Sequence, residues 1–151
     1  MEIELRTART NDRDLLLALI QELYACEHIL FDEARATHAL GNLLADPSLG
    51  RVWVVERGGL PVGYAVVTLG YSLEFGGRFA LLDELFILEE HRGTGAGRQA
   101  LAGIAQICRE LGLEALRLEV DRANRGAQEL YRKVGFATHD RDLMTLWLGR
   151  S

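Results

Sequence analysis

The sequence predicts a single α/β domain with a mixed central sheet, and three observations support this. Strand-like and helix-like segments alternate along all 151 residues. The composition is 48% apolar and 26% charged, as in a globular domain that buries its own core without a disulfide or structural metal. The sequence contains no repeat, low-complexity tract or linker, so we expect one domain over residues 1–151.

In the first half of the chain, apolar periodicity predicts a strand, two helices and a hairpin. These elements are expected at residues 3–5, directly after Asn11, and at residues 33–45, 52–56 and 62–69. Asp46 precedes a proline and therefore ends the second helix, because such a residue avoids the helical region. Gly58 and Gly59 supply the turn of the hairpin.

In the second half, the same reasoning predicts a loop, three strands and two helices. The loop is expected at residues 71–77, the strands at residues 79–88, 116–120 and 144–148, and the helices at residues 98–111 and 125–134. Gly112 and Gly135 end the two helices, and Asn124 caps the second one.

The charge is distributed unevenly. Residues 11–50 hold seven acidic and two basic side chains, a net charge of −5, whereas residues 92–133 carry a net charge of +3. This asymmetry favours two ligands of opposite charge on one small domain. The alternative interpretation is that both segments are ordinary solvated faces.

Several classes of partner are excluded by the sequence pattern. Apolar runs are far shorter than the roughly 20 residues that cross a bilayer, and the start of the chain shows no secretory signal. Cys26 and Cys108 have no redox or metal-ligand spacing, and the four histidines form no ligand pair. We therefore expect a cytoplasmic protein without a metal, a membrane or a nucleic-acid partner.

Residues 92–97, hereafter the glycine loop, read Arg-Gly-Thr-Gly-Ala-Gly between a predicted strand and a predicted helix. Glycines allow close backbone approach, and the free N–H groups of a helix start bind anions such as a diphosphate. Arg92 and Arg98 can add charge-assisted hydrogen bonds. The spacing matches neither a dinucleotide-binding fingerprint nor a P-loop. The alternative is a turn that only packs a strand on a helix.

A second group of residues follows the glycine loop at a defined spacing, namely Leu118-Glu119-Val120, Asn124, Ala127, Leu130-Tyr131 and Gly135-Phe136. Together, the loop and this group resemble the GCN5-related N-acetyltransferase (GNAT) superfamily over residues 81–136. The resemblance implies a mixed, mostly antiparallel central sheet flanked by helices. It also implies acetyl-coenzyme A (acetyl-CoA) as co-substrate and direct transfer to an amine in a ternary complex.

The resemblance further implies roles for individual residues. The backbone of the glycine loop would hold the pyrophosphate, through Arg92, Gly93, Thr94, Gly95, Ala96 and Gly97. The preceding strand would pair with the pantetheine arm, through Phe86, Ile87 and Leu88. Asn124 would contact the cofactor arm, and Lys133 or Arg132 would contact the ribose phosphate. Tyr131 would face the sulfur and protonate the leaving thiolate; the alternative is a core tyrosine on an apolar helix face.

An ammonium cannot attack a thioester, so a base must first remove a proton. The candidates, in our order, are Asp83, Glu84 and Glu119. Neighbouring residues of a regular strand point to opposite faces, but strands at this place in the family often carry a bulge that breaks the alternation. We expect at least one of the three carboxylates to be a paired structural acid.

The acidic segment at residues 11–50 and the loop at 71–77 would lie on the acceptor side, which favours a small cationic amine. One alternative is acetylation of a peptide or protein N-terminus. Another, from a different class, is a non-catalytic sensor of acyl-CoA. Family members commonly pair, and the apolar residues Met144, Leu146, Trp147 and Leu148 predict a homodimer through a strand at a sheet edge.

Overall fold

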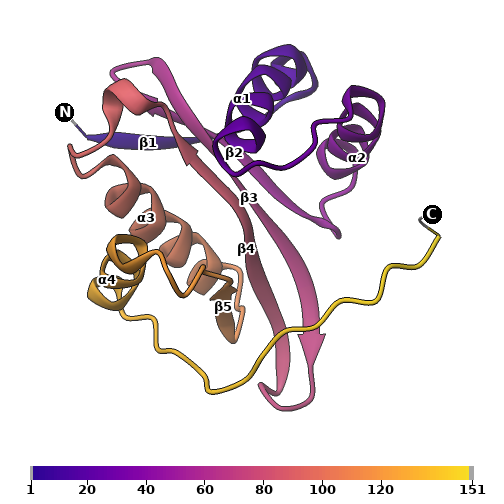
Figure 1. Cartoon of the computed structure of the whole chain (residues 1–151), viewed down its shortest axis with the longest axis vertical. Helices are drawn as coiled ribbons and strands as arrows, with labels where there is room; N and C mark the ends of the chain where they lie inside the picture. Colours follow the sequence, from indigo (N-terminus) through magenta and orange to yellow (C-terminus); the bar gives the residue numbers. More distant parts are fainter. Residues whose placement is uncertain (1, 150–151) are drawn as a thin grey trace. The chain divides into compact units, whose positions relative to one another are not determined.

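The structure is a computed structural model that describes residues 2–149 (Figure 1). It separates into two compact units, Met1–Glu119 and Val120–Ser151. None of the described helices is long and apolar enough to cross a membrane.

The first unit holds a five-stranded sheet with helices on both faces. Its elements are β1 (Ile3–Thr7), a 3-10 turn (Thr10–Asp12), α1 (Arg13–Cys26), α2 (Glu33–Ala45), β2 (Gly50–Arg57), β3 (Leu60–Ser72), β4 (Gly77–Ile87), a second 3-10 turn (Glu89–His91), α3 (Ala96–Glu110) and β5 (Ala115–Leu118). The strands lie in the order β1-β2-β3-β4-β5, antiparallel except for the parallel pair β4 and β5. The predicted mixed, mostly antiparallel sheet is therefore confirmed.

Two core layers pack on this sheet, α1 and α2 on one face and α3 on the other (Figure 1). Under α1 and α2 the strands contribute Val52, Val54, Tyr64, Val66 and Phe86. Under α3 the buried residues are Val55, Val62, Ile87, Ala96 and Ala100. Side chains of β2 and β3 that point to opposite faces thus contribute to both core layers. This is expected of strands covered on both faces.

The hairpin of β2 and β3 forms as predicted, whereas the hairpin of β3 and β4 is longer than predicted. Gly58 and Gly59 both have positive φ, 58° and 79°, as a tight hairpin turn requires. The predicted loop at residues 71–77 is a turn only at residues 73–76, because its two ends belong to β3 and β4. Within this longer hairpin, Gly70 lies opposite Phe79, and a Cβ there would be 2.6 Å from the ring atom Cζ. The glycine makes room for the aromatic ring.

The second unit contains α4 (Arg125–Val134), which begins and ends as predicted. The side chain of Asn124 accepts a hydrogen bond from the Ala127 N–H at 3.1 Å, and Gly135 ends the helix at φ 119°. An asparagine N-cap and a left-handed glycine are common at the first and last turns of a helix, respectively.

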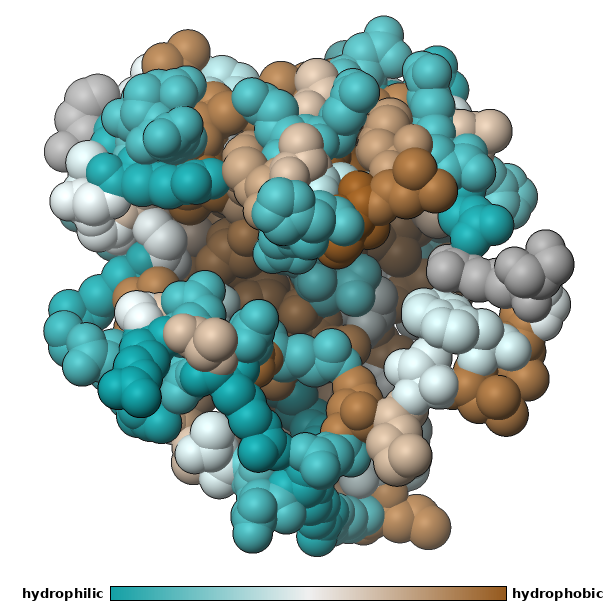
Figure 2. All heavy atoms as spheres, in the orientation of Figure 1, coloured by the Kyte–Doolittle hydropathy of each residue, from teal (hydrophilic) through white to brown (hydrophobic). Residues whose placement is uncertain are grey.

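The predicted final strand at residues 144–148 is wrong. These residues belong to no strand, and Met144, Leu146 and Leu148 are 83–89% exposed. Figure 2 shows apolar side chains standing at the surface of this tail. A strand needs a partner for its backbone groups, and the described part of the second unit contains no other strand to supply one.

Candidate functional site

Strands β4 and β5 separate at the centre of the first unit. Their parallel pairing joins Phe79–Leu82 to Ala115–Leu118, and within the described residues it goes no further. Strand β4 continues to Ile87 while still paired with β3 on its other side. Its edge beyond Leu82 is therefore open to an extended ligand that can add to a strand through backbone hydrogen bonds.

A β-bulge marks the point where the two strands separate. Val67 lies opposite Leu82 and Val66 lies opposite Glu84, so Asp83 is the extra residue of β4. The bulge expected at this strand is present, and it breaks the simple alternation of Asp83 and Glu84.

Glu84 is bound by two tyrosine hydroxyls. Tyr24 of α1 donates to Oε2 at 2.6 Å, and Tyr64 of β3 donates to Oε1 at 2.8 Å. Burial raises the pKa of Glu84, the two hydroxyls counteract that rise, and the charges of Asp83 and Glu27 add to it. Burial and the nearby Glu84 raise the pKa values of both tyrosines, so their hydroxyls stay protonated and donate.

The side chain of Asp83, unlike that of Glu84, has no hydrogen-bond partner among residues 2–149. Desolvation raises the pKa of this carboxyl, although its side chain is accessible to solvent. A carboxylate with unoccupied oxygens and a raised pKa is suited to accept a proton. Three acids lie close enough to interact, because the charges of Asp83 and Glu27 both raise the pKa of Glu84. We call Glu27, Asp83 and Glu84 the acidic cluster.

The end of α1 holds Tyr24 in place through an unusual backbone residue. His28 has φ 57°, the only positive φ among the described non-glycine residues. The Ile29 N–H then donates back to the Tyr24 carbonyl at 2.8 Å, and the His28 N–H donates to the Ala25 carbonyl at 3.4 Å. This is a Schellman ending in which glycine is the usual left-handed residue.

The glycine loop has the geometry that the sequence predicts for anion binding. Gly93 and Gly95 have φ 74° and 85°. Gly95 is the N-cap of α3, and this residue offers no side chain to cap the first-turn N–H groups. These groups, together with the positive end of the helix dipole, suit a diphosphate. The backbone conformation therefore fits the pyrophosphate of coenzyme A.

Arg92 folds back onto the end of β4. Its Nε donates to the Ile87 carbonyl at 2.8 Å, and its guanidinium lies 5.4 Å from the Phe86 ring centroid. The Leu88 N–H donates to the Val62 carbonyl at 2.8 Å. Within residues 86–88, the Ile87 carbonyl and the Leu88 N–H are therefore already engaged. Arg98, in the first turn of α3, is exposed.

Asp83 and Glu119 are the first residues beyond the last pair of β4 and β5. Leu118 lies opposite Leu82 in the parallel pair. Asp83 follows Leu82 within β4, and Glu119 directly follows the end of β5. Glu119 is exposed and makes no hydrogen bond with a described residue, so it stands outside the Tyr24 and Tyr64 network.

The remaining predicted site residues lie in the second unit. Tyr131 is half-buried and packs edge-on against Phe136, with ring centroids 5.9 Å apart. Lys133 is exposed on the same helix. Asn124 uses its side-chain oxygen as the N-cap of α4.

Sequence reasoning missed Tyr24 and Tyr64 as functional residues. Tyr24 lies four positions after Ile20 on the apolar face of α1, and Tyr64 lies within an apolar strand. The available signal was a hydroxyl-bearing side chain on a buried face, because a buried tyrosine hydroxyl usually needs a partner.

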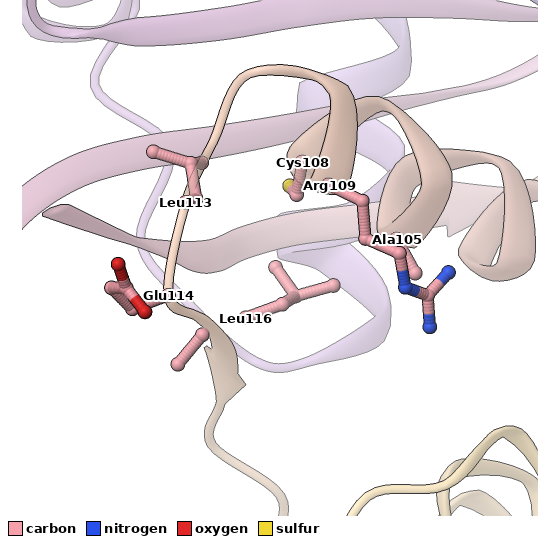
Figure 3. Close-up of a pocket in the computed structure, with 7 residues that line it drawn as sticks. Ala105, Cys108, Arg109, Leu113, Glu114 and Leu116 are labelled. Carbon is pink, nitrogen blue, oxygen red and sulfur yellow. The ribbon is translucent and has the colours of Figure 1, made fainter. Parts of the chain in front are cut away.

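A pocket of about 190 Å³ lies at the other end of α3 (Figure 3). Its lining residues are Ala105, Cys108, Arg109, Leu113, Glu114, Ala115 and Leu116. Burial raises the pKa of the Cys108 thiol, which keeps it protonated and a poor nucleophile. This pocket is separated from the glycine loop by the length of α3.

Comparison with known proteins identifies relatives over most of the chain. Residues 16–136 match the Acetyltransferase (GNAT) family. Thialysine N-epsilon-acetyltransferase of Bos taurus is 27% identical over 148 residues, covering 88% of this chain and 83% of the relative. Aminoalkylphosphonate N-acetyltransferase of Salmonella typhimurium is 32% identical over 133 residues, covering 88% and 84%.

The fold is also found in a solved structure. A predicted acetyltransferase from Clostridium acetobutylicum, determined with acetyl-CoA, superimposes with a TM-score of 0.78. The match covers 95% of this chain and 96% of that protein at 20% identity, so it supports the fold alone.

Proposed function

The chain belongs to the GNAT acetyltransferase family, and from this premise we propose that it transfers an acetyl group from acetyl-CoA to the primary amine of a small cationic acceptor. Its activity as an N-acetyltransferase follows from the family and from its named relatives. The observation that carries the choice of acceptor is the acidic cluster beside the open edge of β4.

The acidic cluster supports a cationic acceptor through its charge. Glu84 and Asp83 are partly desolvated, so their interaction with a cation is less screened than that of surface acids. The relatives named for thialysine and for an aminoalkylphosphonate also act on small amines.

We assign the general base to Asp83. It removes a proton from the ammonium group directly or through one water, and the neutral nitrogen then attacks the thioester carbonyl carbon. The carbon–sulfur bond breaks and the thiolate receives a proton from the Tyr131 hydroxyl. The nitrogen loses its second proton, which restores the Tyr131 hydroxyl directly or through water. The role of Tyr131 rests on the family resemblance of residues 81–136.

Glu84 is assigned to orientation and electrostatics instead. Its two oxygens each accept a tyrosine hydroxyl, at 2.6 and 2.8 Å, which weakens it as a base. Glu84 is thus the paired structural acid expected among the three candidates. Glu119, being exposed, contributes long-range negative charge.

Acetyl-CoA suits the residues present. The glycine loop would hold its pyrophosphate through backbone N–H groups, and the open edge of β4 would pair with the pantetheine arm. Asn124 and Lys133 would contact the cofactor arm and the ribose phosphate, as the resemblance implies.

A substrate panel tests the proposal. Polyamines, amino acids, aminoglycosides and peptides are incubated with acetyl-CoA, and free thiol is measured. We expect thiol release with small cationic amines and its loss in Asp83→Asn. Release only with peptides would support the N-terminal acetyltransferase alternative. Binding of acetyl-CoA without release with any amine would support the sensor alternative.

We also propose a cytoplasmic homodimer. The tail side chains Met144, Leu146 and Leu148 are highly exposed, which favours burial against a second copy. Cys26 and Cys108 are free thiols, in keeping with a reducing compartment. Sedimentation at micromolar concentrations should show a dimer, and a monomer throughout would contradict it.

A further inference from the structure

Arg57 connects the end of β2 to the glycine loop, 37 positions later in the sequence. Its Nη2 donates to the Thr94 hydroxyl oxygen at 2.7 Å. The Thr94 hydroxyl in turn donates to the His91 carbonyl at 2.7 Å. One side chain from the sheet therefore fixes the middle of the loop through a chain of two hydrogen bonds.

The position of Thr94 makes this connection consequential. Thr94 lies between Gly93 and Gly95, whose positive φ values give the loop its shape. Glycines leave the backbone intrinsically mobile, and Gly95 has no side chain to cap α3. The loop therefore depends on contacts from outside it to hold one conformation. The hydrogen bond from Arg57 to the Thr94 hydroxyl is such a contact.

The charge around the loop points to an anion. Arg92 begins the loop, Arg98 directly follows it and Arg57 contacts its middle. None of the three forms an ion pair with an acidic side chain within residues 2–149. In addition, the Nε of Arg57 is buried and has no hydrogen-bond partner among these residues. A buried donor without an acceptor destabilises a protein, so the stability of the fold does not explain its position.

We propose that Arg57 is a positioning residue for diphosphate binding: through Thr94 it holds the backbone N–H groups of the glycine loop in the orientation that binds the pyrophosphate of coenzyme A. This inference rests on the proposed function. It adds to the site a residue of β2 that lies outside residues 81–136.

The test compares two ligands that differ in the diphosphate. Binding of CoA is measured by calorimetry, and turnover is measured with both acetyl-CoA and acetyl-pantetheine, which lacks the diphosphate. Arg57→Ala should weaken CoA binding about tenfold, as for the loss of a hydrogen bond to a charged group. Turnover with acetyl-pantetheine should be unchanged.

Thr94 variants separate the hydrogen bond from the charge. Thr94→Val removes the hydroxyl, keeps all three arginines and should weaken CoA binding as Arg57→Ala does. Thr94→Ser retains the hydroxyl and should bind CoA as the wild type does. The double variant Arg57→Ala/Thr94→Val should bind no more weakly than either single variant, because both remove one shared interaction. Arg109→Gln, at the opposite end of α3, removes one positive charge and should leave CoA binding unchanged.

Each contrary result has a distinct meaning. Wild-type affinity for CoA in folded Arg57→Ala and Thr94→Val would overturn the inference. So would an equal loss of turnover with acetyl-pantetheine, since that indicates general disruption of the fold. If Arg57→Ala does not fold, the exposed Thr94 still decides the question through its valine and serine variants. A wild-type protein that binds no CoA would contradict the proposed function itself.

Discussion

The glycine loop and the acidic cluster would contact their proposed ligands in different ways. The loop offers backbone N–H groups, and its shape comes from two left-handed glycines and a tie to Arg57. The cluster offers side-chain oxygens, and its geometry comes from a bulge in β4 and two tyrosines from other elements. A backbone site resists change in side chains but depends on backbone conformation. A side-chain site has the opposite sensitivity.

The largest expected effect breaks the chemistry of the acidic cluster. Asp83→Asn removes the base and should lower kcat about 100- to 10,000-fold. Because the raised pKa of Asp83 makes the wild-type rate fall as pH drops through it, the variant should instead require higher pH, where the amine is already deprotonated. Kcat against pH measures both effects, and Glu84→Gln is the matched control. An equal loss in Glu84→Gln with no loss in Asp83→Asn would reverse the assignment.

Tyr131→Phe tests the acid and should have the next largest effect. If the hydroxyl protonates the leaving thiolate, kcat falls about 100-fold while CoA affinity barely changes. The edge-on packing against Phe136 survives the substitution, so the melting temperature should stay the same. Half or more of the original turnover, measured where chemistry limits the rate, would make Tyr131 a core residue instead.

Gly95→Val tests the backbone site. A β-branched residue at φ 85° is strained by about 1–3 kcal/mol, so the loop should change conformation and bind CoA roughly ten- to a hundredfold more weakly. Calorimetry gives the affinity, and circular dichroism checks the fold. Gly41→Val in α2 is the control, since a Cβ there meets nothing within 4 Å. Unchanged affinity in a folded Gly95→Val would remove the diphosphate assignment.

Tyr24→Phe should act on acceptor binding and spare the chemistry. Loss of one donor raises the pKa of Glu84 further, so this acid becomes protonated at a higher pH. The KM for a cationic amine should then rise about threefold, as for a modest electrostatic contact, and more so as the pH falls. Tyr71→Phe, at an exposed tyrosine of β3, is the control. A change confined to kcat would place Tyr24 in the chemical step.

The smallest effect concerns the ending of α1. His28→Gly relieves a left-handed conformation and should stabilise the fold by about 0.5–1 kcal/mol in urea unfolding. His38→Gly, inside α2, should destabilise it by about as much, since glycine is unfavourable within a helix. Destabilisation by His28→Gly would show that the imidazole makes a compensating contribution.

The same difference explains what could be predicted from the sequence. The glycine loop is local, because its glycines, its strand and its helix are consecutive. The order of strand, loop and helix was therefore predictable, although α3 begins at Ala96, two residues earlier than expected. The acidic cluster depends on Tyr24 and Tyr64 reaching Glu84 across 60 and 20 positions. Such contacts follow from sheet register and helix placement, which local patterns do not specify.

Two errors in the fold have related causes. The loop predicted at residues 71–77 is a shorter turn at residues 73–76, because β3 runs through Ser72 and pairs with β4 from Gly77. Opposite Phe79, Gly70 leaves room for the aromatic ring within the strand. The segment at residues 144–148 has the composition of a strand, but a strand forms only where a partner satisfies its backbone. In both cases a neighbour distant in sequence decided the local structure.

Because β4 separates from β5, its first part is paired on both sides and its second part is paired with β3 alone. Up to Leu82 its amides lie between two neighbours, and beyond the bulge those that face away from β3 have no strand beside them. Hydrogen–deuterium exchange should therefore be slow in the first part of β4 and fast at alternate amides of the second. An extended ligand lying along that edge would slow the second part alone, so that the exchange pattern of one strand records where the ligand arm lies.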